Sequence, residues 1–181
     1  YRDERGNTYA SVTHILKETS PQWQKDALDR WLERPSAPAE RDIACQRGTL
    51  AHDHAEYVLK TAAKLARNSA NKRGSWRTGD DGLERAPKAI TSWAIEKAIQ
   101  GAPRVSWSAS GYARGLRSWI GENVTAIHAI EFSIHDPRGW AGTADALLDV
   151  NGALCIADWK TSVNARSEEM LANYICQAGA Y

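Results

Sequence analysis

The chain has 181 residues, of which 43% are hydrophobic and 25% are charged, and its formal net charge is +1. This length suits one domain of ordinary size, with enough apolar side chains for a core. No apolar run is long enough to span a bilayer and no secretory hydrophobic segment is present, which argues against a membrane protein and predicts a soluble intracellular one.

Net charge and cysteine content further narrow the classes of protein to which the chain can belong. A net charge near zero lacks the basic excess that usually accompanies phosphate binding, so any nucleic-acid surface must come from the distribution of charge. The three cysteines, Cys45, Cys155 and Cys176, are scattered and odd in number. This argues against a disulfide framework and suits a reducing compartment.

The first two thirds of the chain are predicted to be mainly helical, apart from a strand-like opening segment around residues 11–16. Helical spacing predicts helices over 22–33, 42–66, 83–99 and 108–121. These patterns contain four tryptophans that we interpret as core residues: Trp23, Trp31, Trp93 and Trp119.

Residues 72–77 form a glycine- and serine-containing stretch between two predicted helices. The stretch combines cations with an aromatic ring that could stack on an unpaired base. Its candidate nucleic-acid contacts are Lys72, Arg73, Trp76 and Arg77. A solvated surface loop is an equally good interpretation, since charge runs commonly face water.

A hairpin is predicted where residues 124–135 read as strand-like and Asp136-Pro137-Arg138-Gly139 precedes Trp140, which fits a three-residue loop. In that geometry Asp136 pairs with Trp140, and Glu131 falls opposite Asp145. A four-residue loop would shift the register by one and turn Glu131 to the other face.

Asn151-Gly152 is the strongest signal in the chain for a two-residue hairpin turn. If Val150 and Ala153 flank this turn, Asp145 sits directly opposite Asp158, with Cβ atoms roughly 5 Å apart. Like charges so placed repel, so the pair needs a compensating cation. A divalent metal held by oxygen ligands is the candidate.

The strand after the turn carries Leu154, Ile156, Asp158 and Lys160 on one face, apolar first and then charged. We interpret it as a buried strand whose last inward residues reach an active-site rim. The plainer alternative is that acids near strand ends are solvated and that an Asp-x-Lys triplet arises by chance.

A final helix is predicted from about residue 167, because Ser167 supplies an N-cap and Glu168 and Glu169 supply first-turn acids. The predicted fold class is therefore α+β with a small mixed sheet. We expect a single domain, mainly helical over residues 1–122, with the sheet and the last helix over residues 123–181.

Five ordered motifs resemble the PD-(D/E)XK nuclease superfamily, and within it the RecB-like exonucleases. Three lie in the last third: Gly142-Thr143-Ala144-Asp145, Asp158-Trp159-Lys160-Thr161-Ser162 and Gln177-Ala178-Gly179-Ala180-Tyr181. Upstream, Arg47-Gly48-Thr49-Leu50-Ala51-His52 followed by Glu56 is similar to that branch's helical Gly-Thr-x-x-His motif. The opening Ser11-Val12-Thr13-His14-Ile15-Leu16 resembles that of phage and mitochondrial genome-maintenance exonucleases.

The resemblance implies a restriction-endonuclease-like core and a divalent-metal phosphodiesterase. It makes Asp145 and Asp158 metal ligands, and His52 a further ligand. Lys160 matches the lysine that positions or activates the attacking water. Glu131 matches a catalytic glutamate that the branch often carries on the preceding strand. By pattern alone, however, a histidine on a helix such as that of His52 is more often a surface or core residue.

Four further residues follow from the same resemblance. Gln177 and Tyr181 match a Gln-x-x-x-Tyr motif, whose one-turn spacing puts both side chains on one helix face toward the site or the nucleic acid. Glu56 and Thr161 are candidates for substrate binding or for supporting the ligands. Glu56 has an alternative interpretation as a surface ion pair with Lys60.

Oxygen-rich ligation suits Mg²⁺, and the imidazole of His52 makes Mn²⁺ acceptable too. Some RecB-like nucleases carry an iron–sulfur cluster on four cysteines, but the number and spacing of the cysteines here predict no cluster.

We therefore expect a metal-dependent DNA exonuclease that acts on single-stranded DNA or DNA ends in replication, recombination or repair. The alternatives are an endonuclease of the same superfamily and a non-catalytic nucleic-acid-binding module. A phage or bacterial cytoplasmic origin fits the motifs, with an organelle also open. The chain lacks an initiator methionine and ends within its last motif, which is compatible with a trimmed domain of a longer protein.

Overall fold

The computed structural model describes residues 1–164 and 167–181, and the side chain of Met170 lies outside the described part. The chain divides into two compact units. The terminal unit comprises Tyr1–Gln46, Ser133–Ala144 and Ser162–Tyr181. The central unit comprises Arg47–Phe132 and Asp145–Thr161. Whether the whole chain behaves as one domain stays a prediction.

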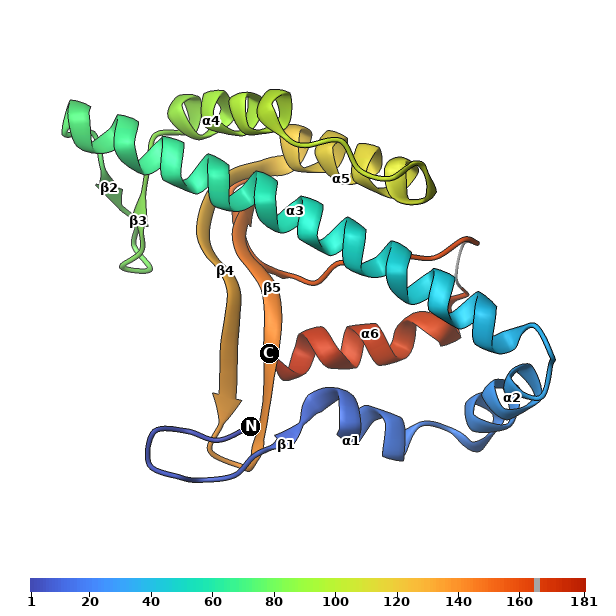
Figure 1. Cartoon of the computed structure of the whole chain (residues 1–181). Helices are drawn as coiled ribbons and strands as arrows, with labels where there is room; N and C mark the ends of the chain where they lie inside the picture. Colours follow the sequence, from blue (N-terminus) through green and yellow to red (C-terminus); the bar gives the residue numbers. More distant parts are fainter. Residues whose placement is uncertain (165–166) are drawn as a thin grey trace. The chain divides into compact units, whose positions relative to one another are not determined.

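The fold is α+β with a small mixed sheet, as predicted (Figure 1). In chain order the elements are β1 Ala10–Ser11, α1 Val12–Thr19, α2 Gln22–Leu32, α3 Ala37–Arg73, β2 Arg77–Thr78, β3 Glu84–Arg85, α4 Lys88–Gly101, a short 3-10 turn Trp107–Ala109, α5 Ser110–Asn123, β4 Val124–Asp136, β5 Trp140–Val150, β6 Ala153–Ala157 and α6 Glu168–Ala180.

The main sheet is built around β5. β1 and β4 lie on either side of β5, and β1 runs parallel to it, with Ala10 beside Trp140. β6 pairs with β5 in antiparallel fashion, while β2 and β3 form a separate two-stranded hairpin. The parallel β1 makes the sheet mixed, and β4 is an edge strand.

The opening segment is mainly helical, so the strand-like interpretation of residues 11–16 is wrong. Only Ala10 and Ser11 form a strand, and α1 begins at Val12. The side-chain oxygen of Ser11 accepts a hydrogen bond from the backbone N–H of His14, which satisfies one of the free donors of the first turn. This N-cap outweighs the β-branched residues that suggested a strand.

Two predicted helix boundaries also need correction. The long helix α3 extends beyond residues 42–66 at both ends and stops where Gly74 takes a positive φ of 55°. The helix predicted from residue 83 begins only at Lys88, after Pro87. The preceding Glu84–Arg85 pairs with Arg77–Thr78 as the β2–β3 hairpin, whose strands are too short to show a periodic pattern.

The core of the central unit is formed by α3, α4, α5 and β5, which gather around small apolar side chains (Figure 1). Leu59, Ile95, Ile120 and Leu148 are among its largest fully buried residues. Alanines on α3, including Ala55 and Ala62, let the neighbouring elements approach closely. Among the described residues, no helix is both long and apolar enough to cross a membrane.

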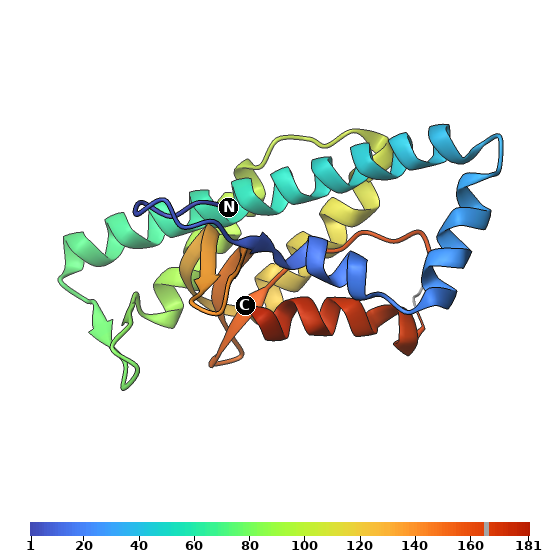
Figure 2. The same ribbon diagram turned by 90° about the horizontal axis from the view of Figure 1, so that it is seen from below.

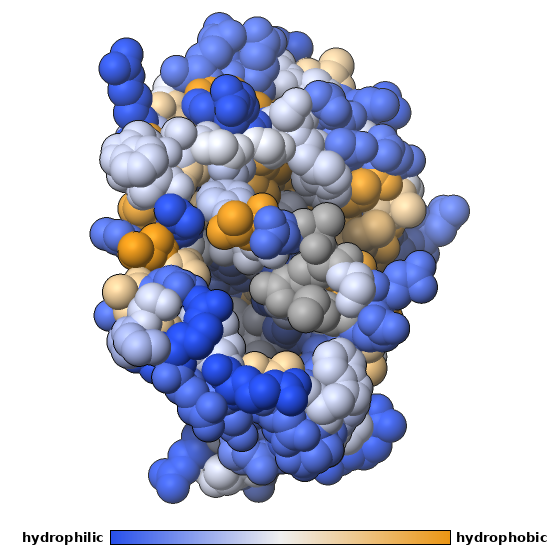
Figure 3. Space-filling view, turned by 90° about the vertical axis from the view of Figure 1, so that its right-hand side faces the viewer, coloured by the Kyte–Doolittle hydropathy of each residue, from blue (hydrophilic) through white to orange (hydrophobic). Residues whose placement is uncertain are grey.

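The terminal unit keeps several large apolar side chains at its surface. Helix α2 buries no residue, and Trp23 is 47% exposed, so its interpretation as a core residue is wrong. The same correction applies to Trp93 and Trp119, which belong to the central unit and are exposed as well. Figure 2 shows the helices from below, and Figure 3 shows apolar patches among hydrophilic side chains on one face.

A buried carboxylate ties the β2–β3 hairpin to the main sheet. Asp149 on β5 is 5% exposed and accepts hydrogen bonds from Arg85 Nε at 2.6 Å and Arg85 Nη2 at 3.2 Å. His128 Nε2 on β4 lies 2.8 Å from the same carboxylate, and Asp81 pairs with the outer side of Arg85. Burial tends to raise the pKa of Asp149, but these bonds from Arg85 and His128 outweigh it and lower the pKa.

We expect Asp149→Ala to lower the free energy of unfolding by about 3 kcal/mol at neutral pH, because Arg85 and His128 lose a buried partner. Glu40→Ala, which removes an exposed carboxylate paired with Arg34, should change it little. Chemical denaturation of both variants and the parent measures this difference.

The Asp149 contribution should also depend on pH. A lowered pKa in the folded protein means that the stabilisation is complete above the unfolded value, near pH 4, and is lost as pH falls through the folded value. The gap between the parent and Asp149→Ala should therefore shrink on acidification. If Asp149→Ala and Glu40→Ala lost the same unfolding free energy, Asp149 would not have the stabilising role assigned to it. The same holds if the difference in stability between the parent and Asp149→Ala did not shrink on acidification.

Candidate metal and nuclease site

The β5–β6 hairpin has the predicted register. Val150 pairs with Ala153 and Ala146 with Ala157, so the next pair along the two chains is Asp145 and Asp158. Asn151 and Gly152 have φ values of 51° and 88°, as a tight hairpin turn of mirror-image type requires. The turn therefore sets which carboxylates meet.

The strand itself is shorter and less buried than predicted. β6 ends at Ala157, so Asp158 and Lys160 lie just beyond the ladder. Leu154 is 45% exposed, while Ala157 and Trp159 pack against the core of the central unit, so a buried face led by Leu154 is wrong.

Asp145 and Asp158 face a shared environment in the central unit. The carboxylate of Asp145 accepts a hydrogen bond from the backbone N–H of Trp159, which links the chain ends beyond the ladder. Asp158 forms an ion pair with Lys160, and the two carboxylates are only 12% and 15% exposed. Both negative charges contribute to raising the pKa of the same residue, His52, so both carboxylates lie within electrostatic range of it.

His52 reaches this pair from α3. Its Nδ1 lies 3.4 Å from Asp145 Oδ2, and this contact is the main cause that raises the pKa of His52, against the opposing effect of burial. Burial tends to raise the pKa of Asp145, but hydrogen bonding by His52 and Trp159 lowers it overall. His52 is thus in contact with Asp145, and its role as a metal ligand stays a prediction.

Glu131 comes to the cluster through an irregularity of β4. The loop of three residues before Trp140 is as predicted, with Gly139 at φ 114°. At the other end of the β4–β5 hairpin, the backbone N–H of Asn151 donates to the carbonyl of Asn123. The predicted register would place Thr125 opposite Asn151, so the observed partner is shifted by two positions. A uniform register is therefore wrong.

Glu131 has a φ of 51°, which is rare for a residue with a side chain and marks a bulge in the strand. Burial, then the negative charges of Asp145 and Glu56, raise the pKa of its carboxyl. The bulge thus leaves Glu131 within electrostatic reach of Asp145. Conformations of this kind are common at functional sites.

Glu56 lies one turn beyond His52 on α3 and forms an ion pair with Lys60, so the predicted ion-pair alternative is realised. Its charge also acts on Glu131, which means that it contributes to the acidic environment. The two interpretations of Glu56 are therefore compatible.

Gly48 explains how α3 passes close to the end of β6. A Cβ atom at this position would lie 3.4 Å from Thr161 Oγ1, so a larger residue would press on the segment that carries Asp158 and Lys160. Gly48 and Thr161 therefore set the spacing between the histidine helix and the Asp-x-Lys segment. Sequence reasoning named both motifs but not this contact.

The donor set suits a hard divalent cation in its chemistry. The proposed donors are three carboxylates and one imidazole, and the pKa of Glu131 is raised first by burial and then by the charges of Asp145 and Glu56. In the side-chain positions of the described residues, however, no group of three or more His, Cys, Asp or Glu is arranged to hold an ion. Asp145 is paired with His52, and Asp158 with Lys160.

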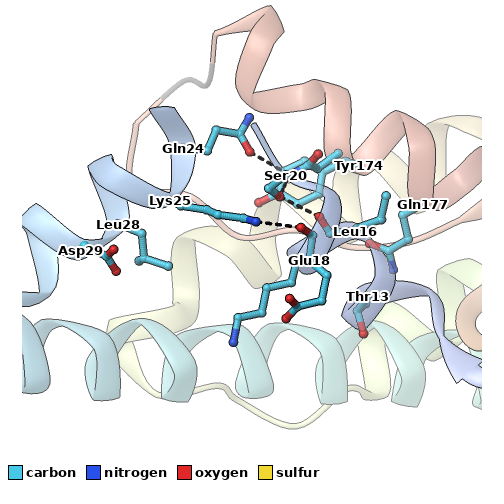
Figure 4. A pocket seen from close by; sticks show the side chains of 12 residues that line it. Thr13, Leu16, Glu18, Ser20, Gln24, Lys25, Leu28, Asp29, Tyr174 and Gln177 are labelled. Carbon is cyan, nitrogen blue, oxygen red and sulfur yellow. Dashed lines mark hydrogen bonds between the residues drawn. The ribbon is translucent and has the colours of Figure 1, made fainter. Parts of the chain in front are cut away.

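Gln177 and Tyr181 belong to the terminal unit, and their proximity to the carboxylates stays a prediction. They share one face of the last helix, because Gln177 Nε2 donates to the Tyr181 hydroxyl at 2.9 Å. Gln177 is 6% exposed and, with Tyr174, lines a cavity of about 550 Å³ between α1, α2 and α6 (Figure 4). Lys25 points across this cavity to the carbonyl of Glu18.

The candidate nucleic-acid contacts after α3 separate into two groups. Lys72 and Arg73 are exposed residues at the end of the helix. Trp76 instead packs partly against the core and donates its indole N–H to Asn71 Oδ1 at 2.6 Å, so it is not a free loop aromatic. Arg77, on β2, lines a cavity of about 440 Å³ together with Lys88.

Comparison with known proteins finds a distant relative. The chain is 24% identical over 164 residues to mitochondrial genome maintenance exonuclease 1 of Mus musculus, and the match covers 86% of this chain. The chain spans only 38% of that protein's length. No family model and no solved structure matches the chain. The similarity indicates an exonuclease-like relationship, but the superfamily itself is not established by it.

Gly142, in the motif before Asp145, gives a test of how the last helix is seated. A Cβ atom there would lie 2.3 Å from Tyr181 Cε1, so the ring must move. We expect Gly142→Ala to lower the free energy of unfolding by about 1–3 kcal/mol through overpacking. Gly115→Ala, in open space within α5, should raise it by about 0.5–1 kcal/mol.

The clash also predicts that the effects of substitutions at Gly142 and Tyr181 on stability depend on each other. In the double variant Gly142→Ala with Tyr181→Ala, most of the Gly142→Ala cost should disappear, because no ring remains to be displaced. Thermal unfolding of the parent, the two single variants and the double variant measures this. If the losses in unfolding free energy of the two single variants simply add in the double variant, Tyr181 does not pack on Gly142.

Proposed function

We propose that the chain is a divalent-metal-dependent DNA exonuclease, acting on single-stranded DNA or DNA ends in replication, recombination or repair. The observation that carries the proposal is the β5–β6 register, because Asp145 and Asp158 directly follow its last pair, Ala146 and Ala157. His52 contacts Asp145, and Lys160 pairs with Asp158. The exonuclease name of the mouse relative supports the reaction class and DNA as the substrate.

Asp145 and Asp158 are the proposed carboxylate ligands, with His52 as a nitrogen ligand and Glu131 as a further catalytic carboxylate. A bound Mg²⁺ or Mn²⁺ acts as a Lewis acid on the phosphodiester and lowers the pKa of a water molecule. The chain's contribution is to hold the two aspartates in place, where a divalent ion would compete with the contacts that His52 and Lys160 make with them.

Lys160 already pairs with Asp158, and His52 already contacts Asp145. The Lys160 ammonium on Asp158 sits where it can orient a phosphate oxygen or a water molecule. We assign it electrostatic positioning rather than proton abstraction. Gln177 and Tyr181 are proposed to orient the nucleic acid, and Thr161 to support the segment that carries Lys160.

We expect Asp158→Asn and Lys160→Ala to lower the rate of oligonucleotide cleavage roughly 100-fold or more, because each removes a charge from the reacting centre. Asp53→Asn, an exposed acid beside His52 on α3, is the matched control and should retain parental activity. The assay is digestion of an end-labelled single-stranded DNA resolved on a sequencing gel.

The product pattern decides between the alternatives. A ladder from one end, with circular single strands left intact, is the expected exonuclease result. Cleavage of circles would assign an endonuclease. Equal cleavage by the parent and by both variants would remove the proposed site, and binding without cleavage would indicate a non-catalytic module.

Metal binding can be tested without DNA. We expect isothermal titration calorimetry with Mn²⁺ to give one site whose affinity falls about 10-fold to 100-fold in His52→Gln, since a ligand is lost. His14→Gln, an exposed histidine on α1, is the control and should bind as the parent does. Unchanged Mn²⁺ affinity in His52→Gln would exclude the histidine as a ligand.

A further inference from the structure

A cationic groove runs along α3 and the edge strand β4 in the central unit. Its volume is about 270 Å³, and its lining includes Lys60 and Arg67 from α3, Trp76, Arg85 and the stretch of β4 from Ala126 to Ile130. We call it the α3–β4 groove. β4 is an edge strand of the main sheet, so this side of it carries no neighbouring strand.

The charge of the α3–β4 groove is one-sided. Of the described residues that line it, three are Lys or Arg and none is acidic. The larger cavity of the terminal unit differs, because Lys17 and Lys25 are matched there by Glu18 and Asp29. Acids outside the lining pair with two of these cations, Lys60 and Arg85, so Arg67 carries the positive charge that is left to attract a ligand.

Arg67 is the cation of the groove that is available to a ligand. Lys60 is paired with Glu56, and Arg85 is held by Asp149 and Asp81. Arg67 is exposed, and within the described part of the chain it forms no ion pair or side-chain hydrogen bond. A guanidinium in this position can bind a phosphate oxygen without first breaking another contact.

Trp76 adds an aromatic surface to the same groove. Its position is fixed by packing against the core and by the hydrogen bond to Asn71, so little conformational entropy is lost when a base stacks on it. The neighbouring Ala63, Ala66, Ala126 and Ala129 keep the floor shallow. A cation and an anchored ring over a shallow floor suit one nucleotide of a flexible strand.

The groove begins beside the candidate site. Lys60, at one end of it, pairs with Glu56, and the charges of both residues act on Glu131. A strand in the groove would therefore pass from Trp76 and Arg67 toward the carboxylates.

We propose that the α3–β4 groove binds single-stranded nucleic acid, with Arg67 on a backbone phosphate and Trp76 stacked on a base, and leads that strand toward Glu131. This inference rests on the proposed nuclease function for its direction. The binding itself can be tested without any cleavage.

The test is fluorescence anisotropy with an end-labelled oligothymidylate in chelator, over a series of salt concentrations. Arg67→Gln should weaken binding about 5-fold at low salt and reduce the slope of log affinity against log salt by about 0.7, which corresponds to one phosphate contact. Lys64→Gln, the same charge change at an exposed residue of α3 that does not line the groove, should leave both quantities unchanged.

Trp76→Leu should weaken binding at least about 5-fold without changing the salt slope, and Trp76→Phe should restore most of the affinity, because a ring is present again. Thermal unfolding of both variants shows whether the core has been disturbed. If Arg67→Gln behaves as Lys64→Gln, or if Trp76→Phe binds as weakly as a folded Trp76→Leu, the groove does not hold the strand.

The possible results distinguish a failure of the groove proposal from a failure of the proposed nuclease function. Binding that depends on Arg67 in a protein that never cleaves DNA would support the groove and overturn the nuclease. Cleavage by a parent whose affinity for the strand is the same in Arg67→Gln would overturn the groove and leave the nuclease standing.

Discussion

The two-residue turn at Asn151 and Gly152 is the constraint on which the candidate site depends. Both residues take positive φ values, so the chain reverses with a fixed offset between β5 and β6. A slip of one residue would send every side chain of β6 to the other face of the sheet and separate Asp158 from Asp145. The geometry of the turn thus determines the electrostatics of a site that lies at the other end of the hairpin.

The electrostatics of the candidate site depends on acidic side chains that lie near one another and on the basic side chains that contact them. Asp145 contacts His52, and Asp158 pairs with Lys160. Glu56 pairs with Lys60, while burial, followed by the charges of Asp145 and Glu56, raises the pKa of Glu131. A divalent ion would compete with His52 and Lys160 for the two aspartates.

The parts of the fold that sequence predicted are those with a local physical cause. The Asn151-Gly152 turn and the Pro137 to Gly139 loop follow from turn chemistry. The last helix begins after Ser167 with two first-turn acids, as predicted, although the Ser167 side chain makes no capping hydrogen bond. The parts that were missed depend on longer-range contacts. Glu131 sits in a bulge that no pattern signals, and the β2–β3 hairpin is held by the buried bonds between Arg85 and Asp149. The role of Gly48 emerges only when Thr161 is beside it. Arg67, which periodicity treats as one more exposed helix cation, becomes notable only through the groove that it lines.

The most direct test of the central claim is a crystal structure of the chain grown with Mn²⁺, with anomalous scattering used to locate the ion. We predict an anomalous peak bound by the carboxylates of both Asp145 and Asp158, with His52 turned from its aspartate to the ion. A peak that touches neither carboxylate, or fully paired Asp145 and Asp158 at saturating Mn²⁺, would contradict the proposal that the turn assembles a metal site.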